Sequence, residues 1–458
     1  MRKSAALLLV LVFLTAPCIA VKPAFSSADI VEDSWASKAS MKVARSGLGV
    51  AVVNDKIYAI GGCTISGFMP SIDGSVVLGY RDLEDLGAFV GTNEEYDPDA
   101  DNWATSRASM PTPRILFATA VCQNKIYCIG GKTSSGLTGV NEVYDPATDT
   151  WETEAPMPTA RGWLTAGVVN GKIYFIGGQP DGTLNEVYDP ATDTWETKAS
   201  TPIVAGFTTV IDNKIYVVGS KLQIYDPETD KWSVGAPLPS VTSPFAAVAT
   251  TGVLAPKRIY VIGRQSDYKP SNCVYDPESD NWTFGADFPT RRFNFGVAVV
   301  NDMLYAIGGH TYDFGRNGYV ETVAVNEQYT PMGYGTVPPA VHVVSPENKT
   351  YVSSNISLAF TVNKPALWMG YSLDGQDNVT STGNTTLAGL ANGLHNITVY
   401  VKDEFENTGA SETVTFTIAK ETEIFPIRLA VVAAVVVAAL LLVAAVGVGL
   451  SAYLKKRK

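Results

Sequence analysis

Four arginines in this 458-residue chain recur at the same distance from a tight turn, and their chemistry suits the binding of an anion. Each precedes an Asn-Asp, Gln-Asn or Asn-Gly turn by nine residues: Arg45, Arg114, Arg161 and Arg292. A guanidinium group presents a planar fork of donors that binds a carboxylate through two parallel hydrogen bonds. A ring of such groups is expected to clamp an acidic ligand. The alternative is that the same groups bind loop carbonyls within the protein.

Further candidates for ligand contact lie beside these arginines or in two long segments between predicted strands. Residue 163 is either a stacking platform or an ordinary packing residue. The long segments run from Cys63 to about Gly91 and over residues 310–319. Long loops in a compact fold are more often functional than ornamental. The additional ligand-binding candidates are Trp163, Tyr80, His310, Tyr312 and Arg316.

Few residues have the types that catalysis or metal binding requires. The chain has only three histidines, His310, His342 and His395. It has no Ser/His/Asp set, zinc-type Cys/His spacing or nucleotide-binding glycine loop. We therefore expect no cofactor and no metal, and we interpret Asp-rich turns such as residues 145–149 as strand connections. A protein without enzymatic activity is favoured.

A phrase that occurs six times positions all of these residues. Its first copy is Lys56-Ile-Tyr-Ala-Ile-Gly-Gly62, and the fourth and fifth copies have Ser220 and Arg264 in place of the second glycine. A second phrase, Tyr-Asp-Pro with a later Trp, follows the first five copies. The sixth copy is followed by Tyr329-Thr-Pro331 without a tryptophan. Such a repeat is typical of solenoids and propellers.

Each unit predicts four antiparallel strands. An apolar run, a tight turn and the Ile-Tyr run form the first two, the glycines end the second, and Asp-Pro opens the turn into a short strand that carries the tryptophan. One such sheet cannot bury both faces, so the units must stack around an axis. Asp33-Ser-Trp35 supplies the strand that the last unit lacks and closes the ring. The prediction is an all-β, six-bladed propeller at residues 29–332.

The six units resemble the kelch repeat over roughly residues 29–331, on the strength of the Gly-Gly pair and the spaced Tyr and Trp. The resemblance implies a kelch propeller in which the arginines and the long segments of blades one and six share one face. In many kelch domains, arginines at this rim meet acidic ligands. Kelch copper oxidases need several histidines, whereas this propeller has one. Kelch-type sugar mutarotases use few charged groups and remain the enzymatic alternative.

A second domain is predicted at residues 340–420, after a Gly/Pro linker at 333–339. Apolar residues at period two, such as Ile356, Leu358 and Phe360, indicate half-buried strands of an Ig-like β-sandwich. The run Tyr371-Ser-Leu-Asp-Gly375, among others, resembles Ig-like modules of archaeal surface proteins. The whole chain resembles archaeal cell-surface kelch proteins with such a stalk and a C-terminal membrane anchor. The resemblance implies a spacer near the membrane.

Asn-x-Ser/Thr sequons gather in this second domain. Five of the six candidate glycosylation sites fall there, and one falls in the propeller: Asn281, Asn348, Asn355, Asn378, Asn384 and Asn396. The enrichment favours a glycosylated stalk. The alternative is that Ser and Thr are simply common in strands.

Both ends of the chain carry membrane signals. Residues 1–28 have the basic start, apolar run and small residues of a signal peptide, with an uncleaved anchor as the alternative. Residues 429–454 contain no charge and predict a transmembrane helix, followed by a basic cytoplasmic tail at 455–458 and preceded by a juxtamembrane segment at 421–428. The prediction is a single-pass type I cell-membrane protein with its large part outside.

Charge and cysteine content limit the classes of partner that this chain is expected to bind. The segment between the two terminal signals retains all 45 acidic residues and 26 of the 34 basic ones. Such an acidic surface argues against nucleic acid as a partner. The four cysteines of the predicted mature chain suggest no disulfide framework. We expect a membrane-anchored binding or adhesion protein whose propeller face recognises an extracellular protein or glycan, with a sugar mutarotase or a structural envelope component as alternatives.

Overall fold

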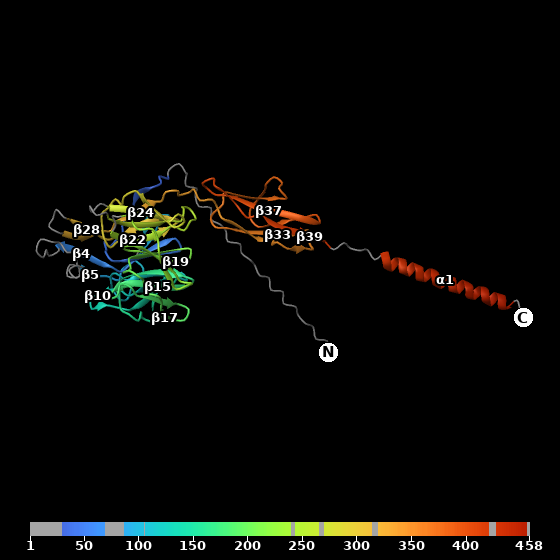
Figure 1. Cartoon of the computed structure of the whole chain (residues 1–458), viewed down its shortest axis with the longest axis horizontal. Coiled ribbons are helices and arrows are strands. Elements are labelled where there is room, and N and C mark those ends of the chain that lie inside the picture. Colours follow the sequence, from blue (N-terminus) through green and yellow to red (C-terminus); the bar gives the residue numbers. More distant parts are fainter. Residues whose placement is uncertain are drawn as a thin grey trace. The chain divides into compact units, whose positions relative to one another are not determined.

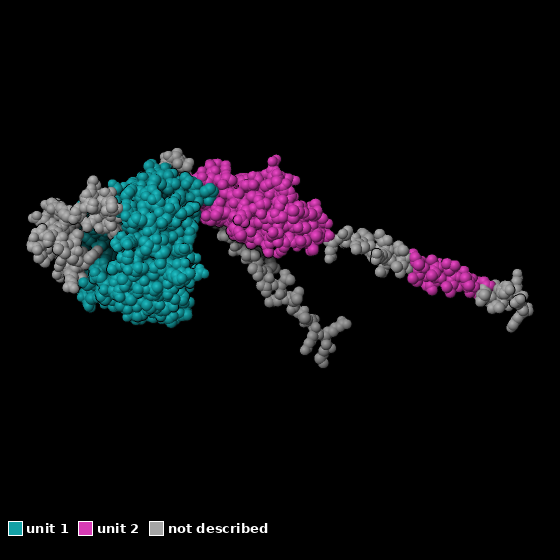
Figure 2. Space-filling model, viewed as in Figure 1, with its two compact units in different colours: residues 1–338 teal, residues 339–458 magenta. Residues whose placement is uncertain are grey.

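The computed structural model describes residues 30–68, 87–104, 106–239, 243–264, 270–313, 319–420 and 427–455 (Figure 1). The chain divides into two compact units, Met1–Pro338 and Pro339–Lys458, which Figure 2 distinguishes by colour. Each unit has hydrophobic clusters of its own. The predicted signal peptide lies outside the described residues.

Among the described residues, the first unit has seven four-stranded antiparallel sheets, and six of them have the strand order that the repeat predicts for a blade. The first three are β2 (Gly49–Val53), β3 (Lys56–Ile60), β6 (Asn93–Asp97) and β7 (Asn102–Trp103); β8 (Ala118–Cys122), β9 (Lys125–Ile129), β12 (Asn141–Asp145) and β13 (Thr150–Glu154); and β14 (Gly162–Val169), β15 (Lys172–Gln179), β16 (Asn185–Asp189) and β17 (Thr194–Thr197).

The remaining three sheets complete the set of blades. They are β18 (Phe207–Ile211), β19 (Lys214–Val218), β20 (Leu222–Asp226) and β21 (Lys231–Val234); β22 (Ser243–Ala249), β23 (Ile259–Arg264), β24 (Pro270–Asp276) and β25 (Asn281–Gly285); and β26 (Gly296–Val300), β27 (Met303–Ile307), β30 (Asn326–Thr330) and β1 (Ser34–Lys38).

The sheets form a closed ring. Successive inner strands contact one another from β2 through β8, β14, β18 and β22 to β26, and β26 contacts β2 again. The outer strand of blade six is β1, which pairs with β30 and places Trp35 opposite Tyr329. The predicted closure by the N-terminal strand is therefore confirmed, because this pairing gives the last blade its fourth strand.

The double glycine ends the second strand of a blade for a steric reason. Gly62 has a φ of +98°, and a Cβ atom there would lie 2.9 Å from the carbonyl oxygen of Ser46. Only glycine accepts both the left-handed backbone and this approach. In blade four, where Ser220 replaces the second glycine, just three residues connect β19 to β20.

The blades are joined by a polar contact that repeats six times. The hydroxyl of Tyr96 donates to Asp101 at 2.6 Å, Asp101 accepts the backbone N–H of Ala39 at 2.8 Å, and the indole N–H of Trp103 donates to the Ala39 carbonyl at 2.7 Å. Asp33, Trp35, Tyr329 and Ala286 make the same contact at the closure. Each contact crosses from one blade to the next, so the Tyr, Asp and Trp of the repeat stabilise the ring.

The predicted linker is partly packed on the first unit. Gly335 donates its N–H to the Leu254 carbonyl at 2.7 Å, Gly333 donates to the carboxylate of Glu32 at 2.6 Å, and Tyr334 is buried. The residues after blade six thus belong to the propeller unit as far as Pro338.

The second unit is a sandwich of two sheets around one core. One sheet is β31 (Val341–Ser345), β33 (Ile356–Val362) and β36 (Thr385–Leu387). The other is β32 (Thr350–Tyr351), β39 (Val414–Ile418), β37 (Gly393–Lys402), β34 (Trp368–Leu373) and β35 (Val379–Ser381), with β38 (Thr408–Ala410) on β37. Leu358, Val399 and Phe416 from the two sheets meet in the core, as the period-two pattern predicts.

The C-terminal helix is α1 (Ile427–Lys455), and its side chains are described at residues 434–449. Among the described residues, no helix reaches the length and hydropathy that a membrane crossing requires.

Candidate functional site

The long segments of blades one and six form one additional sheet. It consists of β28 (His310–Asp313), β29 (Tyr319–Thr322), β4 (Cys63–Phe68) and β5 (Gly87–Phe89), in that order. The central pair places Tyr319, Val320 and Glu321 opposite Phe68, Gly67 and Ser66. In Figure 1, β4 and β28 lie in the same part of the propeller unit although they come from opposite ends of its sequence, and β29, which pairs with β4, lies between them in the sheet. The prediction that both segments crowd one sector of one face is confirmed in this stronger form.

Side-chain hydrogen bonds join β4 to β29 within this cross-blade sheet, and a buried apolar cluster packs the sheet against the rim loops. The hydroxyls of Ser66 and Tyr319 are 2.8 Å apart, and Thr322 both accepts the Ile65 N–H and donates to the Ile65 carbonyl. Ile65 and Val320 are buried in a cluster with residues of the neighbouring rim loops. The sheet is thus anchored from below, while Ser66 and Glu321 are exposed.

A small cavity lies between this sheet and the rim. It is lined by Ser46, Gly47, Cys63, Ile65, Phe89, Ile115, Leu116 and Asn294. Its volume of about 10 Å³ has room for roughly one water molecule. Ligand recognition in this sector would therefore use the exposed surface rather than this cavity.

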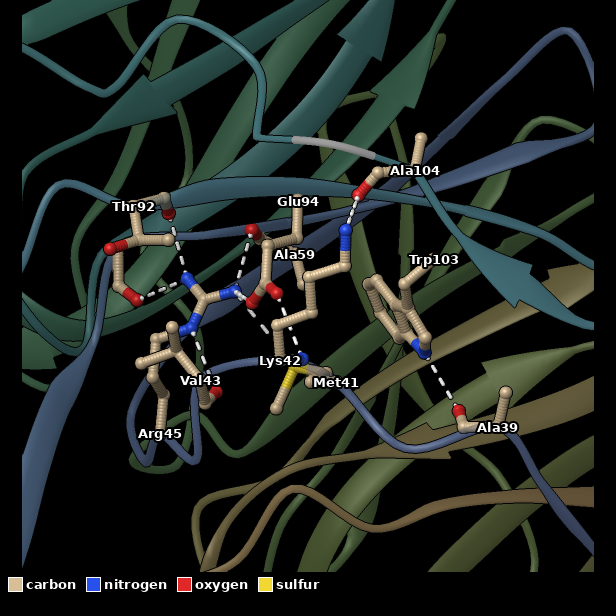
Figure 3. A network of polar contacts seen from close by, with 11 residues as sticks. Ala39, Met41, Lys42, Val43, Arg45, Ala59, Thr92, Glu94, Trp103 and Ala104 are labelled. Carbon is tan, nitrogen blue, oxygen red and sulfur yellow. Dashed lines mark hydrogen bonds and ion pairs between the residues drawn. The ribbon is translucent and has the colours of Figure 1, made fainter.

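The four arginines do not form an exposed ring, which corrects the prediction of a carboxylate clamp. Their exposed fractions are 0 to 1%. Arg45 binds Glu94 at 2.7 Å and donates to the carbonyls of Gly61 and Thr92 at 2.9 and 2.7 Å (Figure 3). Its guanidinium group is saturated by partners within its own blade. The alternative interpretation, internal hydrogen bonds to carbonyls, agrees with this geometry.

The other three arginines repeat this arrangement. Arg114 lies 2.5 Å from Glu142, Arg161 lies 2.7 Å from Glu186, and Arg292 is paired with Glu327. They also donate to carbonyls at the end of the second strand, among them those of Cys128, Gly177 and Gly308. Each arginine therefore joins a rim loop to the double-glycine bend and to the third strand.

Burial changes the acidity of these groups. Desolvation lowers the pKa of Arg45, Arg161 and Arg292, and the facing glutamates partly offset that effect because each favours the charged guanidinium. Replacing both partners of a buried ion pair by apolar residues is often nearly neutral, whereas removing one partner is strongly destabilising.

His310 is also buried, which corrects its assignment as a ligand-binding residue. Its Nδ1 lies 2.8 Å from the hydroxyl of Ser46, and its ring packs against Phe293. Desolvation lowers its pKa to about 4, so the ring is neutral at pH 7. The group contributes to the contact between blades six and one and is not available at the surface for proton transfer.

The remaining candidates divide between described and undescribed residues. Trp163 is half-buried with a φ of +57°, and its backbone N–H donates to the Leu116 carbonyl at 2.9 Å. Tyr312 lies on β28, but nothing is described of its side chain. Tyr80 and Arg316 lie outside the described residues. All six sequon asparagines are exposed.

Sequence reasoning missed two sets of residues. The glutamate partners of the arginines lie two residues before the repeat tyrosine, as Glu94 does before Tyr96. The aspartates of the inter-blade contact lie two residues before each tryptophan and adopt a positive φ, as Asp101 does. Both sets repeat at fixed offsets, and that regularity was a usable signal. The cysteines of the described part are unpaired and buried.

The comparisons with known proteins agree with the repeat. Residues 44–64 and 113–158 match the Kelch motif. Halomucin of Haloquadratum walsbyi is 32% identical over 139 residues, which are 26% of this chain and 2% of halomucin. Alpha-scruin of Limulus polyphemus is 30% identical over 106 residues, 23% of this chain and 9% of the scruin. Beta-scruin is 28% identical over 153 residues, 31% of this chain and 14% of that protein.

These matches support the presence of kelch repeats in the propeller unit. The matched segments span only a small part of each relative. The solved structure titled "Structure of YjhT" aligns with a TM-score of 0.47 at 16% identity, covering 63% of this chain and 96% of that one. That level of similarity carries no functional argument.

Proposed function

We propose that this protein is a non-enzymatic binding protein whose recognition surface is the cross-blade sheet formed by β28, β29, β4 and β5. The observation that carries the proposal is the joining of two long segments into one anchored sheet above blades one and six. Folding a surface out of two distant segments costs conformational entropy, and its buried underside repays that cost. The exposed side then presents strands and loop ends to a protein or glycan.

The membrane anchor and the extracellular location are proposed from the sequence. The apolar run at 429–454 and the basic residues after it support anchoring to a cell membrane with the propeller outside. The two-sheet sandwich of the second unit is compatible with an Ig-like spacer. We place the binding surface accordingly on an extracellular head.

The proposal is tested by ligand capture with the full chain. The tagged protein is screened against a glycan array and, after cross-linking, against cell-surface proteins identified by mass spectrometry. Ser66→Arg with Glu321→Arg alters the exposed side of the cross-blade sheet. Ser233→Arg with Glu228→Arg is the matched control, because both residues are exposed on blade four.

The first double variant is expected to lose at least tenfold in captured ligand, and the control is expected to match the unchanged protein. Equal capture by all three proteins would place the binding surface elsewhere. The absence of any captured glycan or protein would refute the binding function itself.

A further inference from the structure

Two open sheet edges of the second unit lie on the same side of its sandwich. β35 is the outer strand of the larger sheet, and β36 is the outer strand of the three-stranded sheet. Only residues 382–384 separate these strands along the chain. The backbone therefore crosses from one sheet to the other at a side where both sheets end.

These two short edge strands carry no charged residue and no proline, which are common obstacles to pairing at an open edge. They consist of Val379-Thr-Ser381 and Thr385-Thr-Leu387, without charge or proline, and Val379 is 49% exposed. The opposite edges are flanked by Lys349 before β32 and Pro346 after β31, whereas β36 has no charge or proline beside it and β35 has Asp377 two residues before it. An unprotected edge offers unpaired backbone groups to another chain, and Lys or Pro is a common obstacle to such pairing.

A sequon begins at each unprotected edge. Asn378-Val-Thr380 runs into β35, and Asn384-Thr-Thr386 runs into β36. Both asparagines are exposed. The side-chain oxygen of Asn384 accepts the N–H of Phe360 at 3.0 Å, next to the last ladder pair between Leu358 and Thr385. This bond uses the amide oxygen, whereas an N-linked sugar is attached through Nδ2.

We propose that N-linked glycans on Asn378 and Asn384 cover the β35 and β36 edges and prevent them from pairing with a second copy of the chain. In the modification, Nδ2 loses a proton and bonds to the anomeric carbon of a sugar. The bond between that carbon and the phosphate of a polyprenyl-linked donor breaks, and the phosphate leaves with the electron pair. The attached glycan is bulky and hydrophilic, so it occupies the space that an added strand needs.

The test compares edge sequons with interior ones in the full chain, produced in a host with an N-glycosylation pathway. Asn378→Gln with Asn384→Gln removes the two edge glycans. Asn355→Gln with Asn396→Gln is the matched control, since these asparagines adjoin or lie in the interior strands β33 and β37 (Figure 1). Thr380→Val with Thr386→Val removes the same edge glycans while keeping both asparagines. Peptide mass mapping measures occupancy, and light scattering over a concentration series measures self-association.

Both edge variants are expected to self-associate at a concentration at least tenfold lower than the unchanged protein and the control. Unmodified Asn378 and Asn384 in the unchanged protein would refute the modification. Occupied sites whose loss leaves self-association equal to that of the control would refute the edge-covering role. Ligand capture by the propeller is a separate readout, so this proposal and the proposed recognition surface can fail independently.

Discussion

Blades one, two, three and six differ from blades four and five in a way that shows how a buried charge is kept or lost. The first group holds an arginine and a glutamate in each blade, both almost fully buried. In the second group, Gln223 and Cys273 stand where the glutamates stand, two residues before the repeat tyrosine. Blades four and five thus lack both the arginine and the glutamate. This is expected, because an unpaired buried charge is much costlier than a neutral site.

Blade four shows how the neutral site is satisfied. Nine residues before the Asp212-Asn213 turn of this blade, the position of the arginines in the other group is occupied by Ile203. The side-chain amide of Gln223 accepts the N–H of Ile203 at 3.0 Å and donates to its carbonyl at 3.1 Å. The rim loop is still joined to the third strand, but by a pair of neutral hydrogen bonds. The ion pair is therefore one of two solutions to the same structural requirement.

The largest effect is expected from breaking an ion pair on one side. Glu142→Ala leaves Arg114 buried without its carboxylate and should lower the free energy of unfolding by about 3–5 kcal/mol. Denaturant unfolding of the propeller, followed by tryptophan fluorescence, measures this. The double variant Arg114→Met with Glu142→Leu should recover most of the loss. A single variant that costs less than about 1 kcal/mol would contradict the dependence of each charge on its partner.

Placing one unpaired charge inside blade four is expected to lower the free energy of unfolding by nearly as much. Gln223→Glu buries a carboxylate without an arginine, which should raise its pKa and destabilise blade four by about 3 kcal/mol at pH 7. The cost should shrink near pH 4, because the protonated carboxyl is neutral like the amide. Unfolding midpoints at both pH values decide this, with Gln223→Met as the uncharged control. A cost independent of pH would show that packing, and not charge, distinguishes the blades.

His310, in the sector of blades one and six, should make the stability of the protein depend on pH. The folded-state pKa of His310 is lowered to about 4 from 6.5, so the unfolded chain binds more protons between these values. Stability is therefore complete above about pH 6.5 and falls as the pH decreases toward 4, by up to about 3 kcal/mol. His310→Gln should flatten the unfolding curve in this window. An unchanged slope would mean that His310 is solvated.

The smallest loss of stability is expected when a tyrosine hydroxyl of the inter-blade contact is removed, and this loss should be equal in both groups of blades. Tyr144→Phe in blade two and Tyr275→Phe in blade five each remove a hydroxyl that donates to an inter-blade aspartate. We expect a loss of about 1–2 kcal/mol for each, because the acceptor is charged but lies near the surface. Chemical unfolding compares the two variants. A difference larger than about 1 kcal/mol between them would show that the ring contact is not equivalent around the propeller.

The number of blades and the closure of the ring were predictable from the sequence. The phrase with Ile-Tyr and Gly-Gly is local, and each copy specifies a hairpin and a bend on its own. Trp35 occupied the only position that matched the missing sixth tryptophan. A repeat that stacks on its neighbours leaves few ways to assemble, so local patterns were sufficient for the architecture.

The arrangement of the candidate site was predictable only in part. Ring closure brings the long segments of blades one and six together, but the pairing of Tyr319 with Phe68 depends on contacts between residues far apart in the chain. The spacing of the arginines was equally compatible with exposed and internal roles. Whether the arginines are buried or exposed depended on their glutamate partners, which the repeat pattern did not single out.

The sequence by itself determined six blades, their strand order and the strand that closes them, because these follow from a repeated local pattern. The tertiary structure decided that Arg45 and its equivalents face inward to a glutamate and that His310, the first residue of the additional sheet, is buried. The physical reason is that burial and pairing are properties of the assembled ring. A side chain becomes desolvated only when distant segments meet around it.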